Sequence, residues 1–205
     1  GGTLEELRRI HPVLPPAVVI HNGAVGGIEP EPPGRGIGCV GSIRPYKDPR
    51  TVARAARRTL EPVIWIGPGA REIEALQELA GGRLGWEPPL ASGRIPQRLA
   101  RFRALLLPLS AGLFGERLTS PLKLWDALAS GIPLVAADTP AVREAAGAGF
   151  VPYPPGDADA LVAALDAACR DEALRTRVLD AAGGRVRRWS DRAAEIETFA
   201  DRVIR

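Results

Sequence analysis

Short apolar runs alternate with amphipathic stretches along most of the chain. The runs at residues 37–40, 63–66, 104–107, 134–137 and 149–151 have the length and composition of buried parallel strands. The apolar spacing elsewhere predicts helices that begin at Asp48 and cover 73–79, 96–101, 120–130, 139–145, 157–169, 173–189 and 191–205. This alternation predicts an α/β fold with a doubly wound parallel sheet of the Rossmann type.

The first 36 residues are expected to lie outside this sheet. Apolar residues at helical spacing predict a short helix over 3–10, and residues 17–20 are expected to form a short strand. Residues 26–36 are rich in Gly, Pro and Glu, which indicates a linker or surface loop. We therefore expect an N-terminal segment, a main domain and a C-terminal helix at 1–36, 37–190 and 191–205.

Composition and charge exclude several classes of protein. The net charge is only +3, and acidic and basic residues alternate, so no basic run is long enough to follow a nucleic acid. No stretch approaches the roughly 18 apolar residues of a membrane span. Two cysteines, Cys39 and Cys169, are too few to indicate a disulfide framework or a metal cluster. Such low cysteine usage fits a protein of a reducing compartment. The chain contains no Met, so we expect it to be part of a longer protein.

Lysine is almost absent from a chain that carries 27 cationic residues. The only lysines are Lys47 and Lys123, and each stands where the loop after a predicted strand leads into a helix. In an open α/β sheet, ligands bind outside the carboxyl ends of the strands. Both lysines are therefore candidates for binding an anion, and the alternative is that they are solvated cations.

The turn from Gly41 to Asp48 is the first candidate site. Gly41 allows close backbone approach, and Arg44 and Lys47 place two cations at the sheet edge, as a diphosphate requires. The segment lacks the GxGxxG and GxxxxGK[ST] patterns. A dinucleotide oxidoreductase or a P-loop phosphotransferase is therefore disfavoured.

The second candidate site begins at Ser120, which precedes Pro121 at an expected helix start. Free backbone N–H groups at such a start favour anion binding. Lys123 and Asp126 lie on one side of the expected helix, together with Thr119 and Ser130. Lys123 is suited to a phosphate and Asp126 to a pair of sugar hydroxyls; the alternative is an exposed i,i+3 ion pair.

At this point the sequence resembles a known family. The run SPLKLWDALASGIPLVAAD, preceded by LLLPLS and, far upstream, by VGSIRPYKD, resembles the donor-binding C-terminal half of GT-B glycosyltransferases of the group 1, family 4 type. VVIHNG resembles the hinge between the two halves, and IWIGPG resembles the turn after the second strand. The resemblance extends over residues 17–205 and is most specific over 120–138.

The resemblance implies the donor-binding half of a retaining glycosyltransferase. Its substrate would be a UDP-, GDP- or ADP-linked sugar, with no metal ion and no cofactor. The acceptor-binding half precedes the hinge in this family, so the fragment alone is expected to be inactive. The terminal helix from Asp191 would pack on that half, or form a homodimer through Ile196, Phe199 and Val203. The intact enzyme is expected in the cytoplasm, with peripheral membrane association left open.

The resemblance also implies site residues, although no catalytic residue is assigned in this half. Asp126 stands where a glutamate normally binds the ribose, and the family's other acidic position is Leu118 here. Glu116 and Thr119 are then the candidates for the donor sugar. The diphosphate would be bound by Ser42, Arg44, Lys47, Ser120, Leu122 and Lys123, and the nucleobase would lie on the loop of Gly85, Trp86 and Glu87. Trp86 either stacks on the base or covers apolar surface.

Two other functions stay open. A nucleotide-sugar epimerase or hydrolase of the same fold would share the phosphate site but needs an acid/base pair, which we do not find in the sequence. A degenerate, non-catalytic nucleotide-binding module is favoured by Leu118 and disfavoured by the presence of both lysines at phosphate positions. His21 in the hinge is expected to be a structural histidine, and Asp138 either caps the following helix or takes part in function.

Overall fold

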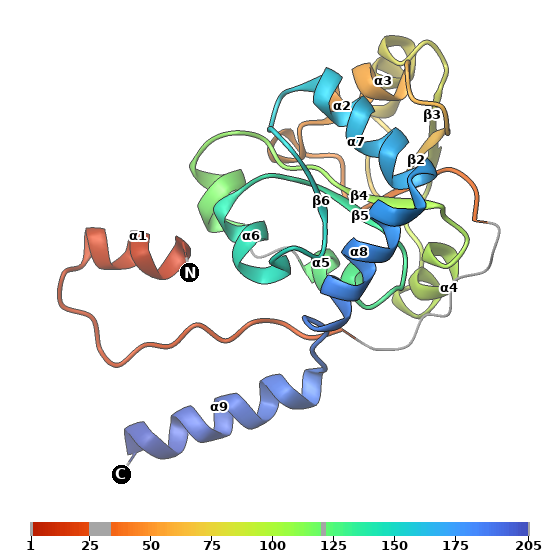
Figure 1. Cartoon of the computed structure of the whole chain (residues 1–205). Helices are drawn as coiled ribbons and strands as arrows, with labels where there is room; N and C mark the ends of the chain where they lie inside the picture. The colour runs from red at the N-terminus through yellow and green to blue at the C-terminus, as the bar shows by residue number, and fades with distance from the viewer. Residues whose placement is uncertain (1, 25–33, 120–121, 205) are drawn as a thin grey trace.

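The computed structural model describes residues 2–24, 34–119 and 122–204. The described chain forms a six-stranded parallel sheet with the strand order β3-β2-β1-β4-β5-β6 (Figure 1). The expectation of a doubly wound, Rossmann-like α/β fold is confirmed. The strands are β1 (Ile37–Val40), β2 (Val63–Ile66), β3 (Leu84–Glu87), β4 (Ala104–Leu107), β5 (Leu134–Ala137) and β6 (Val151–Tyr153).

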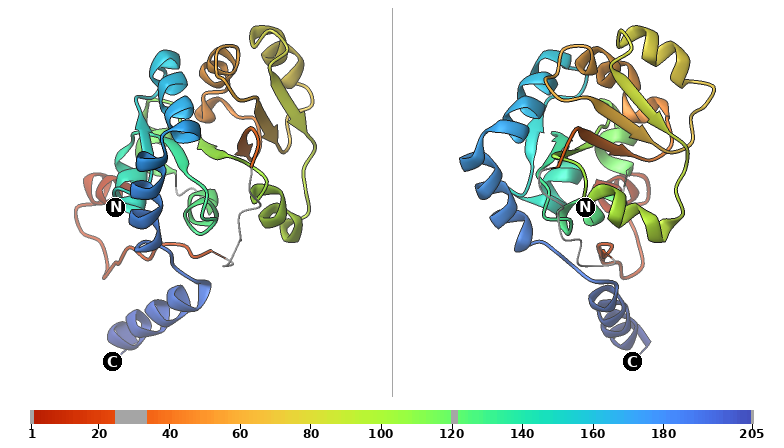
Figure 2. Two further views of the ribbon diagram at one scale, coloured as in Figure 1. Left: turned by 45° about the vertical axis from the view of Figure 1, so that its right-hand side comes forward. Right: turned by 90° about the vertical axis from the view of Figure 1, so that its right-hand side faces the viewer.

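Helices cover both faces of the sheet (Figure 2). On one face α2 packs between α3 and α7, and α7 crosses β4 and β5; on the other, α5 packs on β4. The long helices are α1 (Gly2–Ile10), α2 (Pro49–Ala56), α7 (Ala158–Arg170), α8 (Glu172–Gly183) and α9 (Trp189–Ile204). The short helices are α3 (Ile73–Leu79), α4 (Ile95–Leu99), α5 (Leu122–Leu128) and α6 (Pro140–Ala146).

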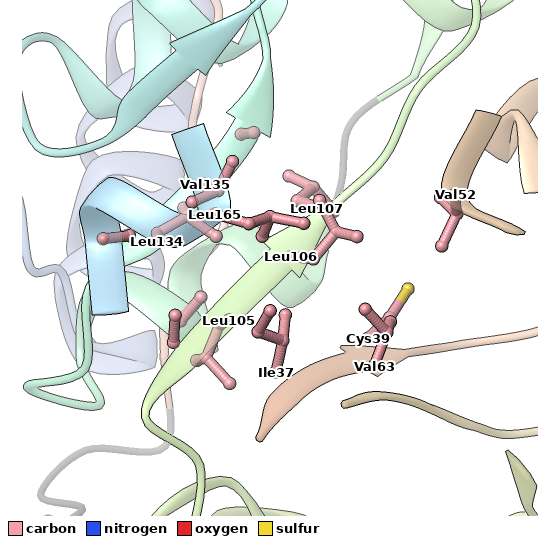
Figure 3. Close-up of a cluster of buried hydrophobic side chains, with 14 of the residues drawn as sticks. Ile37, Cys39, Val52, Val63, Leu105, Leu106, Leu107, Leu134, Val135 and Leu165 are labelled. Carbon is pink, nitrogen blue, oxygen red and sulfur yellow. The ribbon is translucent and has the colours of Figure 1, made fainter. Parts of the chain in front are cut away.

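The strands are apolar because both faces of the sheet are covered. All four residues of β4 and all four of β5 are buried. Figure 3 shows Ile37 and Cys39 of β1 and Leu106 of β4 among side chains that include Val52 of α2 and Leu165 of α7. Burying a large aliphatic side chain contributes about 1.5–3 kcal/mol. This packing therefore fixes the positions of the strand ends, from which the candidate loops leave.

One predicted strand is shifted in the structure, and one strand of the structure was not predicted. The last strand is β6, two residues later than the predicted 149–151, because Gly149 packs against the backbone of Ala182 instead. Strand β3 was missed because Leu84 and Trp86 alternate with Gly and Glu, which gives no continuous apolar run. Gly85, expected in a loop, therefore lies inside a strand at the edge of the sheet.

The N-terminal segment contains a helix but no strand at 17–20. Residues 17–23 have no regular structure, and pairing is limited to one parallel bridge between Ala24 and Arg188, with Ala24 N–H donating to Arg187 O at 2.7 Å. No neighbouring strand lies beside 17–20 in the described chain to complete a ladder. The segment instead connects to the start of α9, where Arg192 donates to Asn22 Oδ1.

Helix α9 extends away from the body of the sheet (Figures 1 and 2). None of its described residues is buried. Ile196 and Val203, on the expected apolar face, are 46% and 49% exposed. Within residues 2–24, 34–119 and 122–204, no helix combines the length and the apolar character needed to cross a bilayer.

Candidate functional site

Strand order reverses between β1 and β4, and the loops that follow these two strands meet at the carboxyl edge of the sheet. Ser110 N–H, after β4, donates to Tyr46 O, after β1, at 2.8 Å. The ring of Phe114 packs on that of Tyr46 with centroids 4.9 Å apart. Such a switch point is where open α/β sheets bind ligands. The two loops therefore form one candidate site.

The first loop turns twice between β1 and α2. Its 3₁₀ turn η1 (Pro45–Lys47) ends at Asp48, which has a left-handed backbone with φ of 44°. Asp48 then begins α2 as expected: its carboxylate accepts from Thr51 N–H at 3.4 Å, and Pro49 occupies the first helical position. This reversal directs the Lys47 side chain back over the end of β1.

The Lys47 amine lies directly against Gly41. A Cβ atom built on Gly41 would be 2.1 Å from Lys47 Nζ, and Gly41 has a φ of +133°. Burial lowers the pKa of Lys47, and the charges of Lys123 and Arg44 lower it further. No carboxylate pairs with this amine in the described ranges. Lys47 is thus a half-buried cation whose neighbours are also cations.

Lys123, in the first turn of α5, is the second cation at this edge. Its Nζ lies 3.1 Å from Asp126 Oδ2, so the i,i+3 pair expected as the alternative is present. Leu122 begins α5 with its side chain 52% exposed. Ser120 and Pro121, which were expected to start this helix, lie outside the described residues.

The polar stripe expected on α5 is only partly correct. Ser130 is fully buried after the end of the helix, where its hydroxyl donates to Ala127 O at 2.6 Å and accepts from Ile132 N–H at 3.1 Å. It closes the turn into β5. Spacing alone placed Ser130 on the helix because the sequence does not show that α5 stops at Leu128.

The indoles of two tryptophans donate hydrogen bonds to the turns that follow β1 and β2. Trp65 and Trp86 are register partners on β2 and β3. Trp65 Nε1 donates to Gly41 O at 2.7 Å, and Trp86 Nε1 donates to Gly67 O at 2.9 Å. A Cβ on Gly67 would lie 2.5 Å from Gly41 O. The indole of Trp86 therefore has a structural role, whether or not a base stacks on it.

Glu87, at the end of β3, is held by an arginine that the sequence did not single out. Arg98 of α4 donates to both carboxylate oxygens of Glu87, at 2.7 and 3.0 Å. This hydrogen bond lowers the pKa of Glu87. Arg98 also lies 4.2 Å over the ring of Phe102. Fork-shaped pairing of this kind fixes the side chain and the backbone that carries it.

In the loop after β4, Glu116 and Thr119 form hydrogen bonds within the loop, while Arg117 pairs with Glu6 of α1. The loop includes the π-helical turn η3 (Phe114–Leu118). Glu116 Oε1 accepts from Gly112 N–H at 3.1 Å, and Thr119 Oγ1 donates to Phe114 O at 2.6 Å. Both candidates for the donor sugar therefore stabilise the fold of the loop itself.

The remaining candidates lie around this edge. Ser42 is half-buried, while Arg44 is exposed and lines a separate pocket of about 910 Å³ between α2 and α3, which Arg50 and Glu72 also line.

Asp138 does not cap α6: it pairs with Arg143, and Thr139 Oγ1 accepts from Val142 N–H instead. Thr139 caps α6 because it directly precedes Pro140, which occupies the first helical position.

His21 contacts the helix that carries Lys123. Its ring lies 5.5 Å from that of Trp125 in α5, and Nε2 is 3.7 Å from Glu144 in α6. Burial lowers the pKa of His21, and the Glu144 charge partly opposes this. These contacts fit the expected structural histidine. Nothing in the sequence around His21 signals them, because its partners lie over a hundred residues away.

The donor set for a metal ion is lacking in the part of the chain that the structure describes. No group of three His, Cys, Asp or Glu side chains comes together there. Cys39 and Cys169 are free and buried, and burial raises the pKa of Cys39 to about 12, so its thiol stays neutral beside Lys47.

The family model described as "Glycosyl transferases group 1" matches residues 34–171, which include every strand from β1 to β6. The chain belongs to the group 1 glycosyl transferases. A search of curated proteins found no match.

Solved glycosyltransferase structures share the fold of this group 1 chain. Sucrose-phosphate synthase from Thermosynechococcus elongatus aligns with a TM-score of 0.78 and 16% identity, covering 99% of this chain and 56% of that one. Anabaena Alr3699/HepE in complex with UDP-glucose aligns with a TM-score of 0.74 and 17% identity, covering 90% and 57%. This chain thus spans little more than half the length of these proteins.

One similar structure is itself a single domain. The C-terminal domain of a glycosyl transferase group 1 family protein (LpcC) from Francisella tularensis aligns with a TM-score of 0.59 and 22% identity. The alignment covers 76% of this group 1 chain and 91% of that domain. At this identity the likeness concerns the fold alone.

Proposed function

We propose that this chain is the donor-binding half of a retaining glycosyltransferase and that its switch-point site binds the diphosphate of a nucleotide sugar. The observation that carries the proposal is that Lys47, after β1, and Lys123, in the first turn of α5, are the chain's only lysines and lie close enough for the charge of one to lower the pKa of the other. Family membership supports a transferase. HepE, with a similar fold, is described in complex with UDP-glucose, with UDP and glucose, and with UDP.

The electrostatics of Lys47 favour an anionic ligand. A half-buried amine beside two other cations is destabilised until negative charge compensates it. A diphosphate supplies that charge and can bridge Lys47 and Lys123, with the exposed Arg44 at its outer side and the backbone of Ser42 and Leu122 next to it. Because Lys123 already pairs with Asp126, Lys47 is the less compensated cation of the two.

The proposed role of this half in the reaction is mainly electrostatic. When the bond between the sugar and the diphosphate breaks, negative charge grows on the departing nucleoside diphosphate, and Lys47, Lys123 and Arg44 stabilise it without a metal ion. Asp126 is proposed to bind the ribose hydroxyls, and the end of β3, at Trp86 and Glu87, to face the base. We propose that the acceptor is positioned by a second half of the protein, on which α9 packs, and that this chain alone is inactive.

Calorimetric titration with UDP, GDP and ADP tests the proposal. We expect one nucleotide to bind, and Lys47→Gln and Lys123→Gln each to weaken it by ten-fold or more, which is about 1.4 kcal/mol. Arg177→Gln is the matched control, since it removes one positive charge from the exposed surface of α8. Binding that is absent, or that Arg177→Gln weakens equally, would contradict the proposal.

The two lysines also allow a direct chemical test. They carry the only ε-amines in the chain, so an amine-specific reagent can modify only these two sites and the N-terminus. Bound nucleotide should slow the modification of Lys47 and Lys123 but leave the N-terminal amine unaffected, as read by peptide mass spectrometry. Retention of configuration is tested on the full-length enzyme, by the anomeric proton coupling of the product.

A further inference from the structure

We propose that the groove between α2 and α3 binds a second copy of this chain, which docks on it to form a twofold-symmetric dimer. The groove has a volume of about 910 Å³, and of the residues that line it only Arg44 also belongs to the proposed nucleotide site. Figures 1 and 2 show α2 and α3 at the end of the molecule opposite to α9. This face is therefore distinct from α9, which is proposed to pack on a second half of the protein.

The exposed charges on the two sides of the groove have opposite signs. From residue 49 to 58 every charged side chain is an arginine, and from 72 to 79 every charged side chain is a glutamate. Arg50 and Arg57 line the α2 side of the groove, and Glu72 and Glu78 line the α3 side. All four are exposed, and in the ranges that the structure describes none of them has an ion-pair partner. The groove thus has a cationic and an anionic side that do not neutralise each other.

Most of the remaining lining is apolar. It consists of Ile43, Pro45, Pro49, Ala75, Leu76 and Leu79. Burial of such surface supplies most of the free energy of association, whereas exposed ion pairs mainly set orientation and partner choice. A nucleotide or another simple anion would meet Glu72 and Glu78 as like charges. The groove therefore suits a partner that carries separate rows of acidic and basic groups with apolar surface between them.

The groove itself has the pattern that such a partner needs. Helices α2 and α3 follow the successive parallel strands β1 and β2 through crossovers of the same hand, so they run side by side in the same direction. A twofold axis parallel to both helices preserves the height of each residue along the groove and exchanges the two sides. The arginines of one copy then face the glutamates of the other.

The spacing of the charges along the two helices also matches. Arg50 and Arg57 are separated by about 10 Å along α2, and Glu72 and Glu78 by about 9 Å along α3. Arg50 and Glu72 stand at the starts of their helices, whereas Arg57 and Glu78 stand at the ends. The symmetric arrangement therefore pairs Arg50 with Glu72 of the second copy and Arg57 with Glu78 of the second copy, each pair occurring twice.

Sedimentation equilibrium on this chain tests the interface through a charge swap. The parent chain should form dimers with a dissociation constant on the order of 10–100 µM, because two short helices offer only a small contact area. Arg50→Glu with Arg57→Glu should be monomeric at these concentrations, since like charges would then face one another. Glu72→Arg with Glu78→Arg should be monomeric for the same reason. An equimolar mixture of the two variants should form a 1:1 dimer, because their charge patterns again complement each other.

Arg170→Glu with Arg177→Glu is the matched control. It reverses two exposed arginines of α7 and α8, neither of which lines the groove, and it should dimerise as the parent chain does. Should a charge reversal unfold the chain, as read by circular dichroism, Arg57→Gln and Glu78→Gln take its place. Each of these should weaken the dimer by about five-fold, because it removes two symmetry-related ion pairs.

Three results would overturn the proposal. The first is a parent chain that stays monomeric at about 1 mM, and the second is a mixture of folded charge variants that does not associate. The third is a dimer that persists in both charge variants, or that the control weakens equally, because the interface would then lie elsewhere, for instance on α9. No nucleotide takes part in these measurements, so their result is independent of the proposed function.

Discussion

Lys47 Nζ fills the space that a side chain on Gly41 would occupy. A Cβ built on Gly41 would lie 2.1 Å from the amine, which is too close for a non-bonded carbon and nitrogen. The absence of a side chain at residue 41 is therefore what allows the lysine to fold back over the end of β1. The lack of a Cβ at residue 41 thus determines where the proposed phosphate-binding amine of Lys47 lies.

The first prediction concerns this contact. Gly41→Ala should weaken nucleotide binding by at least ten-fold, because the new methyl group displaces Lys47 Nζ. It should also lower the free energy of unfolding by about 1–3 kcal/mol, since residue 41 has a φ of +133°. Calorimetry and urea unfolding measure the two effects. Gly93→Ala is the control: residue 93 has open space around it, so the variant should bind nucleotide as the parent chain does and should not lower the free energy of unfolding.

The second prediction separates stability from binding at Lys47. Its pKa is lower in the folded chain than the ordinary value of 10.5, so folding disfavours the charged amine at every pH below the folded pKa. This cost disappears as the pH rises through the folded pKa toward 10.5. At pH 7, Lys47→Met should therefore raise the free energy of unfolding of the nucleotide-free chain and weaken nucleotide binding by ten-fold or more. A less stable Lys47→Met variant would contradict this account.

The third prediction concerns the indole of Trp86. Trp86→Phe keeps an aromatic ring but removes the hydrogen bond to Gly67 O. Unfolding in urea should show a loss of about 1 kcal/mol. If the ring also stacks on the base, Trp86→Leu should weaken nucleotide binding more than Trp86→Phe does. Equal binding by the two variants would leave Trp86 with a structural role only.

The fourth prediction concerns acid stability. The Arg98 hydrogen bond lowers the pKa of Glu87 below its ordinary 4.5, so the pair stabilises the fold above that value and is lost as the pH falls through the lowered, folded-state pKa. The free energy of unfolding measured from pH 6 to pH 3 should therefore fall less steeply in Glu87→Gln than in the parent chain. Glu72→Gln, at an exposed carboxylate outside this pair, should leave the slope unchanged.

The fifth prediction tests the independence of the main domain from α9. Removing residues 196–205 should change the free energy of unfolding by less than about 1 kcal/mol, because no described residue of α9 is buried. The shortened chain keeps Arg192 and Glu195, which contact Asn22 and Arg187. Nucleotide affinity should stay the same. A large loss of stability would show that α9 packs on this domain in solution.

Much of the fold could be read from the apolar pattern. Strands β1, β2, β4 and β5 are where the sequence predicts them, because a strand buried on both faces must be apolar throughout. Strand β3 could not be predicted in this way, because it lies at the sheet edge and Leu84 alone of its four residues is buried. The indole of Trp86 in this strand donates a hydrogen bond to Gly67 O in the turn after β2.

The candidate site was predicted less completely than the fold. The rarity of lysine drew attention to Lys47 and Lys123, and the strand ends placed both at one edge. Arg98 could not be singled out among 25 arginines, because its pairing with Glu87 depends on how α4 packs beside β3. The internal bonds of Glu116 and Thr119 were also unpredictable, since they depend on the π-helical turn.

The family, the alternation of strands and helices and the positions of both lysines after strand ends follow from the sequence alone. These depend on local patterns of apolar residues, caps and turn residues, which act within a few positions of one another. Tertiary structure alone decided how those residues are used. It placed the Lys47 amine against Gly41, brought the Phe114 ring against that of Tyr46 and closed the loop after β4 through the hydrogen bond from Gly112 N–H to Glu116. Such contacts arise because the order of strands in the sheet brings distant loops together, and no local pattern records that order.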